Sequence, residues 1–246
     1  MARAQELLSR IGLGEHLRAR VGQLSKGNAQ RVQFLTGYQN AAYAAEYQAF
    51  VDKVRAAEDK LGQGQRLSEA VARYLFKLMA YKDEYEVARL HTQKEFTDRI
   101  ASMFEGDYRI VHHLAPPLTA KKNDKGELVK KAYGPWMRKA FGFMAGLKGL
   151  RGGAFDLFGR TEERRMERAL IAEYRSCIEE LLARLDADRL ALAVEIASIP
   201  EDIRGFGHVK ERHLQTARAK WERLMAQWRQ GDSAQQPVAS RPAATA

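Results

Sequence analysis

The chain has 246 residues and a mass of 27.9 kDa, which is enough for one substantial domain or two small ones. Its 45% hydrophobic and 29% charged residues exclude the collagen-like, disordered and disulfide-scaffold classes. The net charge of +10 and the pI near 9.7 indicate an anionic partner without specifying its kind.

The sequence also indicates the cellular compartment and whether disulfides can form. No apolar stretch approaches the roughly 20 residues that span a bilayer, and the scattered charges of residues 1–20 differ from a secretory signal. We therefore expect a cytoplasmic protein with no membrane partner. Cys177 is the single cysteine, so the chain forms no intrachain disulfide and no Cys-x-x-Cys metal or cluster site.

The first part of the chain is predicted to be helical. Residues 1–27 contain four glycines around a short amphipathic piece and predict a short helix followed by a linker. Apolar residues at steps of three and four then predict one long helix over 28–60, with Asn28 as its cap. A second stripe predicts a helix over 67–88, and a further helix is expected over 93–103.

Helical periodicity is lost in the middle of the chain. The β-branched residues of 108–114 and an extended piece over 128–133 read as two short strands. Asn123-Asp124-Lys125-Gly126 between them is a turn signal, so the pattern predicts one small antiparallel hairpin.

Helices return after the hairpin. Pro135 suits the first turn of a helix that holds Trp136, Ala140, Phe143, Met144 and Leu147. Thr161 is expected to cap the next helix. That helix has a clean stripe made of Met166, Leu170, Tyr174, Cys177, Leu181 and Leu185. Asp186 is expected to cap a helix reaching Ala197, and the last helix is expected over 214–228.

These segments together predict a mainly α protein. The expected architecture is a single helical domain of about six to eight helices over 28–230, with a small antiparallel β-hairpin insertion. An N-terminal helix and linker (1–27) precede it. The Ser, Gln, Pro and Ala of 231–246 predict a disordered tail.

Three patterns that resemble reactive sites favour structural roles. The glycines of 149–153 lack the spacing and the Lys-Ser/Thr end of a P-loop, and they suit a helix end. His112 and His113 are neighbours on a predicted strand, so they point to opposite faces and bind one metal ion poorly. Cys177 lies on an apolar stripe, where a thiol behaves as a small apolar group.

Two patterns suit contact with a partner. Nine basic residues lie between Lys121 and Arg151, against only Asp124 and Glu127, with aromatic residues among them. Such a segment is either a solvated face or a binding site for an anionic partner. Tyr81-Lys82-Asp83-Glu84-Tyr85-Glu86 is either an i,i+4 tyrosine pair with solvated charges or part of an interface.

Six blocks, in order over about 28–230, carry a family resemblance. They are RVQFLTGYQNAAYA (31–44), AVARYLFKLMAYKDEYEVARLHT (70–92), FEGDYRIVHHLAPPL (104–118), GPWMRKAF (134–141), LKGLRGGAFDLFGRTEERRMERALIAEY (147–174) and IRGFGHVKE (203–211). With them the chain resembles the C-terminal domain of the long, single-chain indolepyruvate ferredoxin oxidoreductases, members of the 2-oxoacid:ferredoxin oxidoreductase family.

The resemblance implies a place in an enzyme. Enzymes of this family oxidatively decarboxylate aryl-2-oxoacids with thiamine diphosphate, iron–sulfur clusters and coenzyme A, and they pass electrons to ferredoxin. The domains that bind those groups lie upstream in the family and are not in this sequence, nor is the Gly-Asp-Gly motif for thiamine diphosphate. The sequence is then either a separate subunit, a truncated piece or the tail of a longer product. We therefore expect no catalytic residue, cofactor or metal on this chain.

Three functions follow as hypotheses. The first is a non-catalytic component that docks on the catalytic domains and guides ferredoxin, with Arg138, Lys139, Lys148 and Arg151 as docking charges. Tyr81 and Tyr85 are further contact candidates. The second is a free-standing basic module for nucleic acid or another polyanion, which the lack of any nucleic-acid-binding motif disfavours. The third is an independent enzyme with a site around Tyr81, Lys82, Asp83 and His112.

Overall fold

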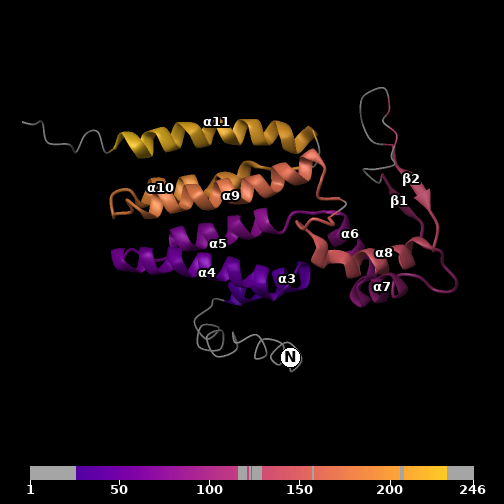
Figure 1. The fold of residues 1–246 in the computed structure, drawn as a ribbon. Helices are drawn as coiled ribbons and strands as arrows, with labels where there is room; N and C mark the ends of the chain where they lie inside the picture. Colours follow the sequence, from indigo (N-terminus) through magenta and orange to yellow (C-terminus); the bar gives the residue numbers. More distant parts are fainter. Residues whose placement is uncertain are drawn as a thin grey trace, which may run out of the picture. The chain divides into compact units, whose positions relative to one another are not determined.

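A computed structural model describes residues 26–115, 121, 123, 129–156, 158–205 and 208–231. The predicted N-terminal helix and linker (1–27) and the predicted tail (231–246) lie outside these residues, apart from two residues at the first boundary and one at the second. Nine α-helices and one two-stranded sheet are present in the described part of the chain (Figure 1). The mainly α prediction with a β-hairpin is therefore confirmed.

Contacts along the chain group into two compact units. Unit 2 is Lys82–Arg164, and unit 1 holds the described residues before and after it. The helices of unit 1 are α3 (Lys26–Tyr38), α4 (Ala41–Glu58), α5 (Arg66–Met79), most of α9 (Glu162–Leu182), α10 (Leu190–Ser198) and α11 (His208–Gln230), with the 3-10 turns η1 (Asp59–Leu61) and η3 (Ile199–Asp202).

Unit 1 is a stack of roughly parallel helices (Figure 1). Helix α5 packs on α4 and on α10, and α10 in turn contacts α11. The stack encloses one apolar core, in which Leu75, Tyr174, Leu181 and Trp228 are almost completely buried. Burial of such large apolar side chains is the main force that holds helices of this kind together.

The single helix predicted over 28–60 is two helices, because the chain turns at Asn40. Asn40 has an extended backbone, and its side-chain oxygen accepts a hydrogen bond from the Tyr43 amide at 2.9 Å, which caps α4. Asn28 does not cap a helix. It lies inside α3 and is buried, and it donates a hydrogen bond to Gln48 of α4 at 3.1 Å. The apolar spacing continues across the break, which is why periodicity alone does not reveal it.

A second break divides the helix predicted over 67–88. Helix α5 ends at Met79, and α6 (Glu84–Thr92) begins after Asp83. The extended Asp83 accepts a hydrogen bond from the Glu86 amide at 2.8 Å and so caps α6. Tyr81 and Tyr85 are therefore not neighbours on one helix; Tyr81 ends the first part of unit 1 and Tyr85 belongs to unit 2.

Unit 2 is built around α6. Its further elements are α7 (Lys94–Ala101), β1 (His112–Leu114), β2 (Lys131–Tyr133), α8 (Met137–Gly146) and the 3-10 turn η2 (Leu147–Leu150). The two strands pair antiparallel, with His112 opposite Tyr133, as the hairpin prediction requires. Helix α6 packs on α8, and Ala88, Met137 and Phe141 form the buried centre of a small apolar cluster.

The helix predicted after Pro135 is α8, and Ala140 and Met144 of its predicted apolar residues pack against the apolar cluster. Trp136 and Phe143 are 59% and 71% exposed, whereas Met137 and Phe141 are buried. Asp186 does not cap α10, which begins at Leu190 after Arg189; the Asp186 side chain accepts a hydrogen bond from the Arg189 amide at 2.8 Å in the preceding turn. Two other helix predictions fit better. Thr161 caps α9 through a 3.4 Å hydrogen bond from the Arg164 amide, and α11 starts at His208, earlier than predicted. No helix in the described residues is both long and apolar enough to cross a membrane.

Candidate functional site

A buried ion pair lies within unit 2. The Arg151 guanidinium donates two hydrogen bonds to the Asp83 carboxylate, at 2.5 Å from Nε and 2.9 Å from Nη2. Both side chains are almost fully buried. Because Asp83 also caps α6, this one carboxylate ties the start of α6 to the chain that follows η2. The pair joins residues 68 positions apart in the sequence.

A second buried carboxylate, Asp156, holds the loop after Arg151 by hydrogen bonds. Its carboxylate accepts hydrogen bonds from the amides of Gly152 at 2.7 Å and Gly159 at 2.8 Å, and from the Tyr85 hydroxyl at 3.1 Å. Gly152 has a φ of 75°, a left-handed conformation that a residue with a Cβ adopts only with strain. The loop is thus folded around a buried carboxylate. We call Asp83, Tyr85, Arg151 and Asp156 the buried network.

The buried network is suited to holding structure rather than to moving protons. Burial, and then the nearby Asp156 and Asp83 carboxylates, raise the pKa of the Tyr85 hydroxyl, so it stays neutral near pH 7. The Tyr85 ring packs edge-on against Phe158 at 5.3 Å. Each carboxylate of the network already accepts hydrogen bonds from this chain, so a general base would first have to give up a structural contact.

The six residues predicted to make contacts differ in how deeply their side chains are buried. Arg138 and Lys139 are exposed on α8. Lys148 is half-buried, and its pKa is lowered by burial and then by the nearby Arg89 and Arg151 charges. The sequence places Arg151, Tyr85 and Tyr81 among surface contacts, but the structure places all three in the interior.

Tyr81 belongs to the aromatic core of unit 1. Its backbone carbonyl accepts a 2.8 Å hydrogen bond from the Tyr38 hydroxyl, and the two rings meet edge-on at 6.1 Å. Of the basic residues predicted to make contacts, Lys148 is half-buried, and Arg138 and Lys139 remain exposed. Sequence spacing could not separate them from Arg151, because all three are basic residues in the same positive segment.

Beside these two charges lie two exposed aromatic residues. Trp136 precedes α8 and Phe143 lies one helical turn after Lys139. We call Trp136, Arg138, Lys139, Gly142 and Phe143 the α8 face. Basic and aromatic side chains together are typical of surfaces that contact an anionic partner.

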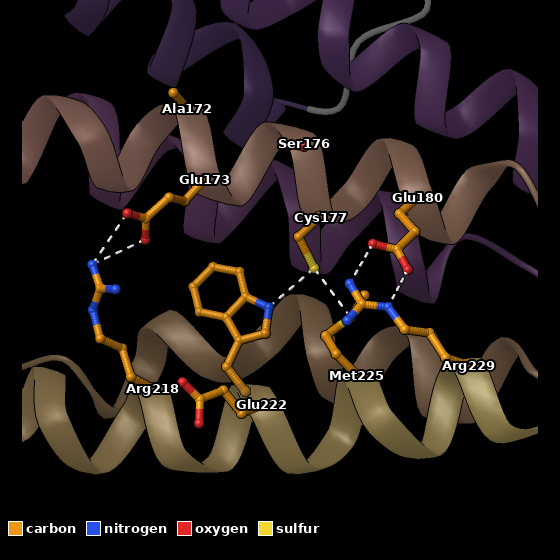
Figure 2. Close-up of a pocket in the computed structure, with 10 residues that line it drawn as sticks. Ala172, Glu173, Ser176, Cys177, Glu180, Arg218, Glu222, Met225 and Arg229 are labelled. Atoms are coloured by element: carbon orange, nitrogen blue, oxygen red, sulfur yellow. Dashed lines mark hydrogen bonds and ion pairs between the residues drawn. The ribbon is translucent and has the colours of Figure 1, made fainter.

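A second feature is an open groove of about 560 Å³ between α9 and α11 of unit 1 (Figure 2). An ion pair closes each end: Arg218 with Glu173 at 3.0 Å, and Arg229 with Glu180 at 2.6 Å. Between the ion pairs, Cys177 of α9 points toward α11 (Figure 2). An anion entering this groove would have to displace a glutamate from an arginine, so the groove is a seam between helices rather than a ready binding site.

The Cys177 thiol is not set up as a nucleophile. It accepts a hydrogen bond from the Trp221 indole at 3.0 Å and lies 3.5 Å from the Met225 sulfur. Burial raises its pKa to about 11, so the reactive thiolate is scarce at neutral pH. The prediction that Cys177 packs as an apolar group is confirmed.

The two histidines of β1 face opposite ways, as predicted. His112 is buried and His113 is exposed. The His112 ring packs edge-on against His91 of α6 and Phe141 of α8, at 5.1 and 5.2 Å. Burial lowers the pKa of both His91 and His112, so both rings are neutral at pH 7 and act as packed aromatic groups. Within the described residues, no three His, Cys, Asp or Glu side chains are arranged to hold a metal ion.

These features define a mainly helical protein whose buried network is hydrogen-bonded within unit 2. The chain belongs to a sequence family described as "Family of unknown function (DUF6537)", which matches residues 25–223. Comparison with curated proteins and with solved structures gave no match.

Proposed function

We propose that the chain is a non-catalytic component of an indolepyruvate (aryl-2-oxoacid):ferredoxin oxidoreductase. In this role it docks on the domains that bind thiamine diphosphate and iron–sulfur clusters and guides ferredoxin to them. The six resembling blocks of 31–211 support the proposal, and the family match covers nearly the same stretch. Under this proposal the protein acts in the cytoplasm.

One observation carries the non-catalytic part of the proposal. The polar residues of the two longest resembling blocks, 70–92 and 147–174, include the whole buried network, where they bind one another. Residues of the resembling blocks that hydrogen-bond to one another inside the chain stabilise its fold. A fold that is held by such internal contacts is what a docking component requires.

The residues of this chain do not fit the cofactors of the implied enzyme. An iron–sulfur cluster needs several thiolates, whereas the chain has one cysteine, which is buried and protonated at neutral pH. Thiamine diphosphate, the clusters and coenzyme A would therefore be held by the partner domains. No step of the reaction is assigned to residues of this chain.

The test is a pull-down of the tagged chain from its native lysate, with the bound fraction assayed for arylpyruvate-dependent dye reduction. We expect activity in the bound fraction and none from the purified chain alone. A bound fraction without such activity would contradict the proposal. Turnover by the purified chain that is lost in Asp83→Asn would instead support an independent enzyme.

The alternative is a free-standing basic module that binds nucleic acid or another polyanion. The exposed Lys130, Lys131, Arg138 and Lys139 favour it. It predicts binding of single-stranded oligonucleotides without base preference, with an affinity that falls steeply as salt rises. The docking proposal predicts that such binding is weak at about 0.15 M salt.

A further inference from the structure

One face of helix α8 packs against other residues of unit 2, and the opposite face is exposed. Met137 and Phe141 point into the apolar cluster with Ala88. The other side of the helix is the α8 face, on which Trp136 and Phe143 are largely exposed. From the features of this face, we propose that it is a docking surface for an acidic protein surface with an apolar centre. The inference rests on the proposed function for the identity of the partner, namely the catalytic domains of the oxidoreductase.

The aromatic residues supply the apolar part of the argument. A tryptophan and a phenylalanine left in water on one short helix forgo the burial that usually stabilises such side chains. Tryptophan and arginine are also the residue types that contribute most where protein partners meet. The Trp136 ring is held edge-on against Tyr133 of β2 at 6.0 Å, so it is positioned before any partner arrives.

The charges indicate that the partner is acidic. Arg138 and Lys139 lie in the first turn of α8, and this turn has no acidic residue. The N-terminus of a helix carries partial positive charge, so cations there disfavour the helix and carboxylates favour it. Neither side chain forms an ion pair with a described residue. Carboxylates of a partner would therefore neutralise both side chains and improve the electrostatics of the helix end.

Gly142 is a third and independent sign of a contact surface. A Cβ placed on Gly142 would meet no atom within 4 Å, and the same holds for Gly146 one turn later. Packing within the chain therefore does not require either glycine, and glycine inside a helix costs stability relative to alanine. Gly142 is exposed, and without a side chain there the surface of a partner can approach the helix closely.

The same features favour a protein over a nucleic acid. A nucleic-acid strand is bound by cations that follow its phosphates over several nucleotides. The α8 face offers two adjacent cations beside two aromatic rings, a compact arrangement that matches a small apolar patch with carboxylates at its rim. The nucleic-acid reading is kept as an outcome of the test.

The experiment compares Gly142→Glu with Gly142→Ala in binding to the purified catalytic domains, measured by titration calorimetry. Both substitutions replace a glycine that nothing crowds, so both variants should fold with unchanged or higher thermal stability. Ala219→Glu, on the exposed side of α11, adds the same charge elsewhere. We expect Gly142→Glu to weaken binding about tenfold or more, and Ala219→Glu to change it less than about twofold.

The outcomes separate the inference from the proposed function. If the unmodified chain binds and Gly142→Glu binds equally well, the docking surface is wrong and the proposed function stands. If the unmodified chain does not bind the catalytic domains, the proposed function fails and the inference fails with it. If a 20-nucleotide single strand binds the unmodified chain and Gly142→Glu abolishes that binding, the α8 face is a nucleic-acid site and the acidic protein partner is overturned.

Discussion

At the scale of single residues, Arg151 illustrates how the burial of a charged side chain determines whether it stabilises the fold or contributes to the surface charge. Arg151 is one of nine basic residues in its segment, yet its side chain is only 2% exposed and binds the Asp83 carboxylate. A buried charge is tolerated when its partner lies at hydrogen-bonding distance, and it becomes costly when the partner is removed. Arg151 therefore contributes to the stability of unit 2 and not to its surface potential.

The corresponding prediction concerns the loss of one partner. Arg151→Met should destabilise unit 2 by about 3–5 kcal/mol, because the Asp83 carboxylate is left buried without its cation. Asp83→Asn combined with Arg151→Met should recover part of that loss, since asparagine still caps α6. Hydrogen exchange of the α6 and α8 amides measures both effects. The control is Arg99→Met on exposed α7; equal effects of the two methionine variants would contradict the prediction.

The burial of Cys177 predicts how stability and thiol reactivity depend on pH. Its folded-state pKa of about 11 lies above the ordinary thiol value of 9.0, because burial disfavours the thiolate. The stability that it contributes is thus fully present below about pH 9 and is lost as pH rises through about 11. We expect the native chain to resist iodoacetamide at pH 8, as read by mass spectrometry, while the urea-unfolded chain is labelled quickly. Rapid labelling of the native chain would show that the thiol is open.

At the scale of elements, one-sided helices are predictable from sequence and their breaks are not. The stripe from Met166 to Leu181 predicts α9 well, because its members face one core. The breaks at Asn40 and Asp83 are missed, since apolar spacing continues across them and each cap is a single side chain. The buried face of α8 is predicted only in part, for another reason: aromatic residues occupy both sides of the helix, and periodicity cannot tell a core face from a docking face.

The N-terminus of α5 shows a contact that sequence spacing does not predict. Glu58, the buried last residue of α4, accepts hydrogen bonds from the amides of Leu67 at 2.7 Å and Ser68 at 2.8 Å, and from the Ser68 hydroxyl at 2.7 Å. A carboxylate from one helix thereby caps the next. The cap also brings negative charge to the positive end of α5.

Replacing this cap gives a prediction for the pair α4 and α5. Glu58→Gln should lower the free energy of unfolding by about 1–3 kcal/mol, because an amide can accept at only one of its two polar atoms. Glu69→Gln, in the exposed part of the same first turn, is the matched control and should change it little. Urea unfolding followed by circular dichroism compares the two. A Glu58→Gln curve that overlays the parent would mean that the cap does not stabilise α5.

At the scale of the whole molecule, net charge and local charge make different contributions. The net charge of +10 draws any acidic partner toward the chain from a distance, and salt screens this attraction. The α8 face acts only at contact, where its aromatic residues also count. The basic segment was visible in the sequence, but its separation into exposed and buried charges required the fold.

The two contributions can be separated by a pair of charge reversals. Arg138→Glu with Lys139→Glu changes the α8 face, and Arg212→Glu with Arg223→Glu makes the same change in net charge on exposed α11. If the α8 face docks the catalytic domains, the first pair should slow association about tenfold at low salt and the second less than about threefold. Stopped-flow association at increasing salt measures both, and the difference should narrow as the charges are screened. Equal slowing by the two pairs would mean that only net charge guides the encounter, and the docking surface would then have to be sought elsewhere on the chain.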